Sequence, residues 1–285
     1  MTDTYKIIYS CGGKSFEISP DSPVKLLAGG LSGFDSTGFE VKITPYASLF
    51  GGYASTRRLA ERELSITAEI DRLCSNGLRR EIMSMLDPQK EGELDVTLFG
   101  VHRKISVIPC GTPTFERATL GDHVIMTLHF IAPAVFFSDI SKKRAEYYCA
   151  MPLLTFPMNF TAEGGVTTGL YGKTDHATLD NSGDTECGIA AIIVANGGQV
   201  VSPTVSLGEK FIRCPFILED GDVLAIDTRP AMKNIYLNGE RCFIFDRNST
   251  FFTLPSGESV VNITAESGGE YIDARVEYAP LYFGV

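Results

Sequence analysis

The sequence predicts a mainly β protein with two β-sandwich-like domains. Short segments rich in β-branched and aromatic residues recur along the chain between turn residues, as in sandwiches. One segment alone shows the periodicity of an amphipathic helix. Charge is uneven: residues 1–138 hold 14 basic and 16 acidic groups, and residues 139–285 hold 11 and 19. We therefore expect a first domain over 1–138 with one packed helix, and a nearly all-β second domain over 139–285.

The first domain opens with a predicted hairpin, residues 4–19, that turns at two glycines. Residues 19–41 are rich in Gly, Ser, Asp and Pro, which predicts a long loop with little regular structure. Alternation over residues 59–68 then predicts a half-buried strand. Its apolar face would carry Arg62, Leu64, Ile66 and Ala68.

The predicted helix follows in the segment SNGLRREIMSMLDP. Ser75 or Asn76 can cap it, and Pro88 ends it because proline cannot continue the backbone hydrogen bonds. One face carries the apolar side chains at helical spacing, Leu78, Ile82, Met85 and Leu86. Paired strands at 93–100 and 101–110, turning at Gly100, and an apolar strand within 123–137 complete the domain.

The charged segment 138–148 interrupts the apolar pattern, so we place the domain boundary near Ser138. Further on, Asn181-Ser182-Gly183-Asp184 is expected to be the turn before a buried strand at 189–194. Asn238-Gly239 is a strong hairpin signal because both residues accept a positive φ. Strand signals recur at 177–181, 187–195, 201–208, 210–218, 222–228, 234–245, 250–255, 259–267 and 273–284.

Composition argues against several classes of function. A formal net charge of −10 does not suit a groove that tracks nucleic-acid phosphates. The seven cysteines have no C-x-x-C spacing, which favours small buried thiols over metal ligands or disulfides. The N-terminus lacks the pattern of a secretory signal, and no apolar run reaches the roughly 18–20 residues of a membrane span. We expect no cofactor and no membrane partner.

No arrangement of residues indicates a catalytic or metal site. His123 and His129 fall on one side of a predicted strand, but a third ligand is lacking, so polar strand ends are the simpler interpretation. The acidic runs at 180–184 and 219–222 do not match a calcium loop and fit tight turns. The densest basic cluster is either solvated or an intermolecular ion-pair surface, because arginine pairs well with carboxylates. Its members, the candidate oligomer-interface residues, are Arg57, Arg58, Arg62, Arg79 and Arg80.

The ordered set of segments resembles the distal tail protein family of long-tailed, non-contractile phages. The first half contributes a glycine before an arginine-bearing strand, a helix ended by proline, a strand pair, and a strand closing at proline and aromatics. These segments are 51–70, 80–88, 93–109 and 124–139. The second half contributes an Asn-x-Gly-Asp turn before a strand and four following segments. These are 179–194, 201–207, 219–228, 235–240 and 249–263.

The resemblance implies a structural protein of the virion tail tip, made in the host cytoplasm, and not an enzyme. Six copies would form a ring through the first domain, with a hairpin arm embracing the neighbour, and the second domain would be a galectin-like sandwich. The ring would join the tail tube protein to the tail-tip hub protein, hold receptor-binding proteins in some phages, and let genome DNA pass without specific binding. The alternative function is a carbohydrate-binding module of galectin-like fold, and a cell-wall hydrolase ranks last.

Overall fold

The computed structural model describes residues 5–36, 38–71, 75–117, 123–152 and 169–285. The chain forms two compact units. The first comprises Met1–Ile140 together with Leu281–Val285, and the second comprises Ser141–Pro280. The last five residues, whose strand the sequence leaves free to pack on either domain, lie in the first unit.

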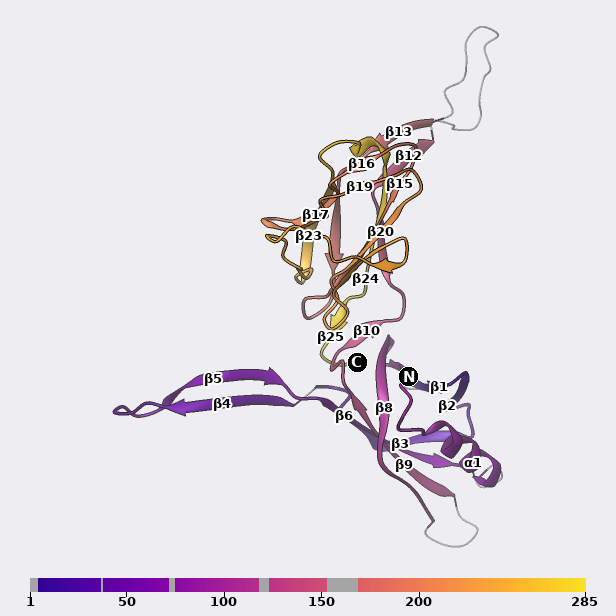
Figure 1. Ribbon diagram of the computed structural model, residues 1–285. Helices are drawn as coiled ribbons and strands as arrows, with labels where there is room; N and C mark the ends of the chain where they lie inside the picture. Colours follow the sequence, from indigo (N-terminus) through magenta and orange to yellow (C-terminus); the bar gives the residue numbers. More distant parts are fainter. Residues whose placement is uncertain (1–4, 37, 72–74, 118–122, 153–168) are drawn as a thin grey trace, which may run out of the picture. The chain divides into compact units, whose positions relative to one another are not determined.

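The first unit is built mainly of strands (Figure 1). Its strands are β1 (Lys6–Cys11), β2 (Lys14–Ile18), β3 (Val24–Ser32), β4 (Phe39–Pro45), β5 (Gly52–Leu59), β6 (Arg62–Ile70), β7 (Gly92–Leu98), β8 (Val101–Glu116), β9 (Val124–Ala132), β10 (Phe137–Asp139) and β25 (Leu281–Tyr282). Its helix is α1 (Ser75–Met85). The main sheet runs in the order β2-β1-β7-β8-β9-β6-β3, with β10 on β8 and β25 on β10.

Alternation along the strands builds the core of this unit. Every second residue of β6, β7 and β9 is buried, and the residues between them lie on the outer face. Helix α1 contributes Ile82 and Met85 to the same core, with Leu78 and Leu86 packed at its edge. The predicted helix and its apolar face are thus confirmed, as are the hairpins β1–β2 and β7–β8. The capping side chains expected at Ser75 and Asn76 lie outside the described residues.

The expected loop over 19–41 is wrong, because β3 and the start of β4 lie there. Strand β3 pairs with β6 on both sides of an irregularity between Leu26 and Leu31. A Cβ atom on Gly30 would lie 2.3 Å from the carbonyl oxygen of Thr67, so this close strand approach requires glycine. Glycines in a bulged strand look like loop residues in a sequence, which explains the error.

The second unit contains two main antiparallel sheets (Figure 1). Its strands are β11 (Lys143–Glu146), β12 (Tyr148–Pro152), β13 (Gly169–Lys173), β14 (His176–Asn181), β15 (Ile189–Ala195), β16 (Val200–Val201), β17 (Thr204–Leu207), β18 (Lys210–Arg213), β19 (Ile217–Leu218), β20 (Val223–Asp227), β21 (Asn234–Leu237), β22 (Glu240–Arg241), β23 (Gly257–Thr264) and β24 (Ile272–Tyr278). One short 3₁₀ turn, η1, spans Gly269–Tyr271. The sheet orders are β11-β24-β15-β20-β21-β22 and β14-β23-β17-β18.

The core strand of the second unit is β15, which lies between β24 and β20. Its alternate residues Ile189, Ala191, Ile193 and Ala195 are fully buried. The predicted turn at Asn238-Gly239 joins β21 to β22, with positive φ at both residues. The segment 138–148 is not a break in the pattern, since β10 and β11 occupy most of it. The predicted strand at 250–255 is wrong, because only the isolated bridge Cys187↔Leu254 forms there.

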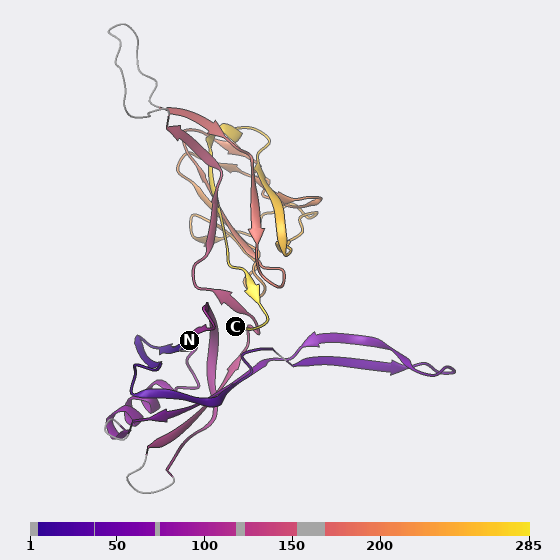
Figure 2. The same ribbon diagram turned by 180° about the vertical axis from the view of Figure 1, so that it is seen from behind.

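The chain leaves the first unit after β10 and returns to it in β25. These two strands are antiparallel neighbours, pairing Phe137 with Tyr282 and Ser138 with Leu281, and the yellow C-terminal arrow lies beside β10 in Figure 2. The preceding strand β24 stays in the second unit. The predicted fold class is confirmed: mainly β, with one helix and a hairpin arm in the first unit and packed sheets in the second.

Candidate functional site

The hairpin β4–β5, which we call the arm, forms a two-stranded sheet of its own (Figure 1). Its register runs from Phe39↔Leu59 to Pro45↔Gly52, with one irregularity between Lys42 and Ile43. Isolated two-stranded hairpins are marginally stable in water, and a third strand or a packed surface usually supports them. We therefore expect the arm to pack against a partner surface, because its own sheet has only two strands.

One face of the arm is largely apolar, with one charged residue, Arg57, opposite Val41. Phe39, Val41 and Ile43 project from β4 with 68%, 55% and 65% of their surface exposed. Leu49 and Phe50 at the tip are also exposed. Contiguous exposed apolar patches on soluble proteins mark interaction sites, because burying such surface gains roughly 25 cal/mol per Å². The apolar face of the arm is our candidate functional site.

The opposite face of the arm is polar. Arg58 Nε donates to Glu40 Oε2 across the two strands. The hydrogen bond from Arg58 holds the pKa of the Glu40 carboxyl below its usual range. Both side chains are exposed, so this ion pair contributes little to stability. Its effect is to keep one face of the arm hydrophilic, which leaves the apolar face as the one to dock.

The structure separates the five predicted interface arginines. Arg57 and Arg58 lie exposed on the arm, and Arg79 and Arg80 lie exposed on α1. The guanidinium of Arg79 lies 5.0 Å from the centre of the Phe115 ring. Exposure leaves these four as interface candidates, and their role in assembly stays a prediction.

Arg62 departs from that prediction, because it is 1% exposed and sits inside the first unit. Its guanidinium donates to the carbonyl oxygens of Val135 (2.7 Å) and Gly33 (2.8 Å) and to that of Phe283. It also lies 4.8 Å from the centre of the Phe137 ring. Burial lowers the pKa of Arg62 to about 10, so the side chain remains charged at neutral pH. Alternation had already put Arg62 on the apolar face of β6, and that signal was the correct one.

The histidine and acidic clusters do not assemble a metal site. His123 pairs with Glu69 at 2.9 Å, whereas His129 lies opposite Cys110 on β8. No group of three or more His, Cys, Asp or Glu residues that could hold a metal ion occurs among the described residues. In the acidic turn, Asp222 accepts from the Asn238 side chain and the Glu219 backbone. That geometry is the one expected of a tight turn.

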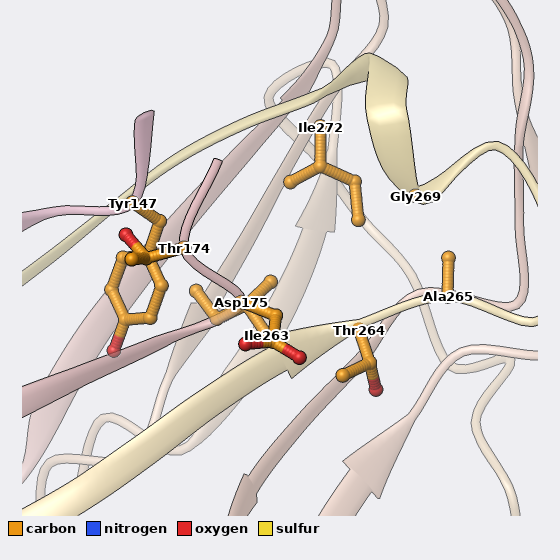
Figure 3. A pocket seen from close by; sticks show the side chains of 8 residues that line it. All are labelled: Tyr147, Thr174, Asp175, Ile263, Thr264, Ala265, Gly269 and Ile272. Carbon is orange, nitrogen blue, oxygen red and sulfur yellow. The ribbon is translucent and has the colours of Figure 1, made fainter. Parts of the chain in front are cut away.

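A pocket of about 420 Å³ lies in the second unit (Figure 3). Its lining includes Ile263 and Ile272 together with Thr174 and Asp175. Tyr147, its aromatic residue, is 2% exposed, and its hydroxyl donates to the carbonyl oxygen of Val261. Sugar rings stack on exposed aromatic faces, so this pocket gives no support to carbohydrate binding.

Part of the second unit matches the model of a known family. Residues 182–282 match the family model of the siphovirus-type tail component, C-terminal domain. The match covers about a third of the chain and, apart from Leu281 and Tyr282, lies in the second unit. The matched family is one of tail components and not of enzymes, as the sequence led us to expect.

Solved structures extend the likeness to the whole chain. The Dit protein (gp 19.1) of phage SPP1, described as a paradigm of the hub adsorption apparatus in phages infecting Gram-positive bacteria, has 13% identity and a TM-score of 0.66. The alignment covers 96% of this chain and 98% of that one. A chain of the phage P2 baseplate in its activated conformation with calcium has 11% identity and a TM-score of 0.52, with 98% of each chain covered. No curated protein sequence matches. The resemblance to distal tail proteins is confirmed, and the chain has the fold of Dit.

The matched region begins within the turn Asn181-Ser182-Gly183-Asp184. Asn181 is 1% exposed, and its side-chain amide donates to the carbonyl oxygens of Thr185 (3.0 Å), Leu254 (3.1 Å) and Pro255 (3.2 Å). Its Oδ1 accepts from the backbone N–H of Gly183 at 3.1 Å. The turn is therefore a structural junction that joins β14 to the segment before β23.

Two cysteines of the matched region, Cys187 and Cys214, are buried thiols. Burial raises the pKa of Cys187 to about 11 and that of Cys214 to about 12. Thiolates are the reactive form, so we expect both to react with a thiol reagent at pH 8 much more slowly than the partly exposed Cys242. Peptide mapping after timed alkylation of the native protein checks this order. Equal labelling of Cys214 and Cys242 would contradict it.

In the described part of the chain, no helix is long and apolar enough to cross a membrane.

Proposed function

We propose that this protein is the ring-forming structural component of a siphovirus-type phage tail tip. Six copies associate through the first unit, and the arm of each copy lays its apolar face on the next. The observation that carries this proposal is the amphipathic arm, which exposes Phe39, Val41 and Ile43 on one face and pairs Arg58 with Glu40 on the other. Dit of phage SPP1, which shares the fold, belongs to a hub adsorption apparatus, and this supports a place at the tail tip.

The same proposal includes the partners implied by the resemblance. The ring joins the tail tube protein on one side to the tail-tip hub protein on the other, and the second unit is a galectin-like sandwich that serves as a platform for receptor-binding proteins. Genome DNA passes through the ring without specific binding. The near balance of 14 basic and 16 acidic groups in residues 1–138 supports this, because a strongly basic channel would retain phosphates.

If the arm docks through its apolar face, adding charge to that face should prevent assembly. Changing Val41→Lys and Ile43→Lys together puts two charges on the apolar face, and we expect the oligomer to dissociate to monomers at micromolar concentration. The melting temperature of the monomer stays within about 2 °C of the wild type, because substitutions at exposed sites change stability little. Light scattering coupled to gel filtration measures the mass, and calorimetry measures the melting.

Thr56→Glu is the control, since Thr56 is exposed on the polar face of the arm and a charge there lies opposite Lys42, with which it can pair. We expect it to assemble as the wild type does. The wild type should show a six-fold ring by negative-stain microscopy. A ring that forms equally well with lysine at 41 and 43 would overturn the proposed role of the arm.

A further inference from the structure

The last five residues, 281–285, which we call the tail, lie inside the first unit. Tyr282 is buried, and the Arg103 guanidinium lies 3.5 Å from the centre of its ring. Arg103 also donates to the carbonyl oxygen of Gly284, and the Tyr282 hydroxyl donates to Asp139 Oδ2 at 3.3 Å. The tail is thus held along its length by residues of the first unit.

The tail lies against the root of the arm. The chain enters the arm through residues 33–36 and Gly38 and leaves it through Ala60, whose N–H donates to the Gly38 carbonyl oxygen at 2.9 Å. The Val285 N–H donates to the Phe34 carbonyl oxygen at 3.1 Å. The entry segment of the arm is therefore bonded directly to the end of the tail.

Arg62 connects the two sides of the root. It lies just after β5, on the exit side of the arm. Its guanidinium donates to the Gly33 carbonyl oxygen on the entry side and to the Phe283 carbonyl oxygen in the tail. The planar guanidinium of Arg62, which lies on the exit side, therefore links the exit segment to both the entry segment and the tail by hydrogen bonds.

Contact between the tail and the entry segment is close enough to exclude any side chain. A Cβ atom on Gly284 would lie 2.1 Å from the Asp35 carbonyl oxygen and 2.9 Å from that of Phe34. Both of these atoms are backbone, so a larger residue at 284 must displace the entry segment.

We propose that Arg62 and the tail act together as positioning elements that fix the direction of the arm, and that ring assembly depends on them. This inference rests on the proposed function, in which the arm docks on a neighbouring copy. The seven residues of β4, at about 3.3 Å per residue, span roughly 23 Å. A rotation of about 10° at the root then moves the far end by about 4 Å, whereas designed interfaces need placement to about 0.5 Å. A consequence is that the arm is not fixed until residue 285 has been synthesised, so assembly waits for the whole second unit.

Gly284→Ala tests the proposal, with Gly269→Ala as the matched control, because a Cβ atom on Gly269 meets nothing within 4 Å. Hydrogen exchange followed by NMR or mass spectrometry reports on the root through the amides of Ala60 and Val285, and on the core through β6. We expect Gly284→Ala to speed exchange at the root at least tenfold and to reduce the oligomer at least tenfold, with β6 unchanged. Gly269→Ala should change neither. If exchange in β6 also rises, Gly284→Ala has disturbed the core as well as the root. Deletion of Val285 alone is then the second variant, because it removes the hydrogen bond to Phe34 with less disturbance of the core. Exchange at the root and the amount of oligomer are measured as before.

The outcomes separate this proposal from the function on which it rests. Unchanged exchange at the root, or faster exchange at the root with normal assembly, would overturn the positioning role while the arm still docks. The variant with lysine at 41 and 43 is expected to lose assembly with wild-type exchange at the root. Normal assembly of that lysine variant would overturn the proposed function instead.

Discussion

Asn181→Asp is expected to destabilise the second unit by about 3–5 kcal/mol at pH 7, the range typical of an uncompensated buried charge. Asn181 is 1% exposed, and its amide group faces three carbonyl oxygens. Aspartate keeps the size of the side chain but replaces two N–H donors by an oxygen that repels those carbonyls. Its remaining oxygen can still accept from the Gly183 N–H.

This loss should depend on pH in a defined direction. Burial and the facing carbonyl dipoles raise the pKa of the new carboxyl above its unfolded value of about 3.9. A group whose pKa is raised on folding stabilises the fold below its unfolded pKa, and that contribution disappears as pH rises through the folded value. The difference between variant and wild type should therefore be smaller at pH 4.5 than at pH 7.

Hydrogen exchange in increasing urea can measure the effect in the intact chain. Amides of β15 report on the second unit, and amides of β6 in the same molecule are the internal reference. Asn248→Asp, which makes the same chemical change at an exposed side chain, should leave both units unchanged. Loss of protection in β15 by Asn248→Asp, or full protection in Asn181→Asp, would refute the role assigned to Asn181.

Period-two patterns predicted much of this fold because burial alone determines them. In β6 the apolar residues alternate with polar ones, and the structure buries the residues that this alternation selects. In β15 every residue is apolar, so the sequence predicts a buried strand but not which of its residues form the inner face. The turn at Asn238-Gly239 could also be predicted from the sequence, since few residue pairs tolerate positive φ at both positions. Strand β3 could not be predicted in this way, because Gly30 serves a close approach to Thr67 that no local pattern shows.

Long-range contacts determined the features that the sequence could not indicate. The tail reads as a continuation of β24, and only its pairing with β10 shows that it belongs to the first unit. The family resemblance implies an arm but not its position, because alternation over residues 59–68 predicts one continuous strand. In the structure β5 ends at Leu59 and β6 begins at Arg62. This break places Arg57 and Arg58 on an exposed ribbon and Arg62 in the core.

Arg62→Met is expected to destabilise the first unit by about 3 kcal/mol or more. Methionine fills much of the volume of arginine, and removing a desolvated charge is itself favourable, so loss of the charge does not explain the expected destabilisation. The destabilisation comes from three carbonyl oxygens that lose their donor, those of Gly33, Val135 and Phe283. An unsatisfied buried polar group costs about 1–3 kcal/mol. The contact with the Phe137 ring is lost as well.

Arg62→Lys should fall between methionine and the wild type. Lysine keeps the charge and three donors, but a single ammonium group cannot reach acceptors arranged around a planar fork. Arg57→Met is the matched control, because Arg57 is exposed on the arm, and it should leave the stability of both units unchanged. Exchange in urea again gives the measurement, now with β6 as the reporter and β15 as the reference. Equal stability of the Arg62→Met protein and the wild type would mean that water replaces the lost donors, and that Arg62 does not hold the root of the arm.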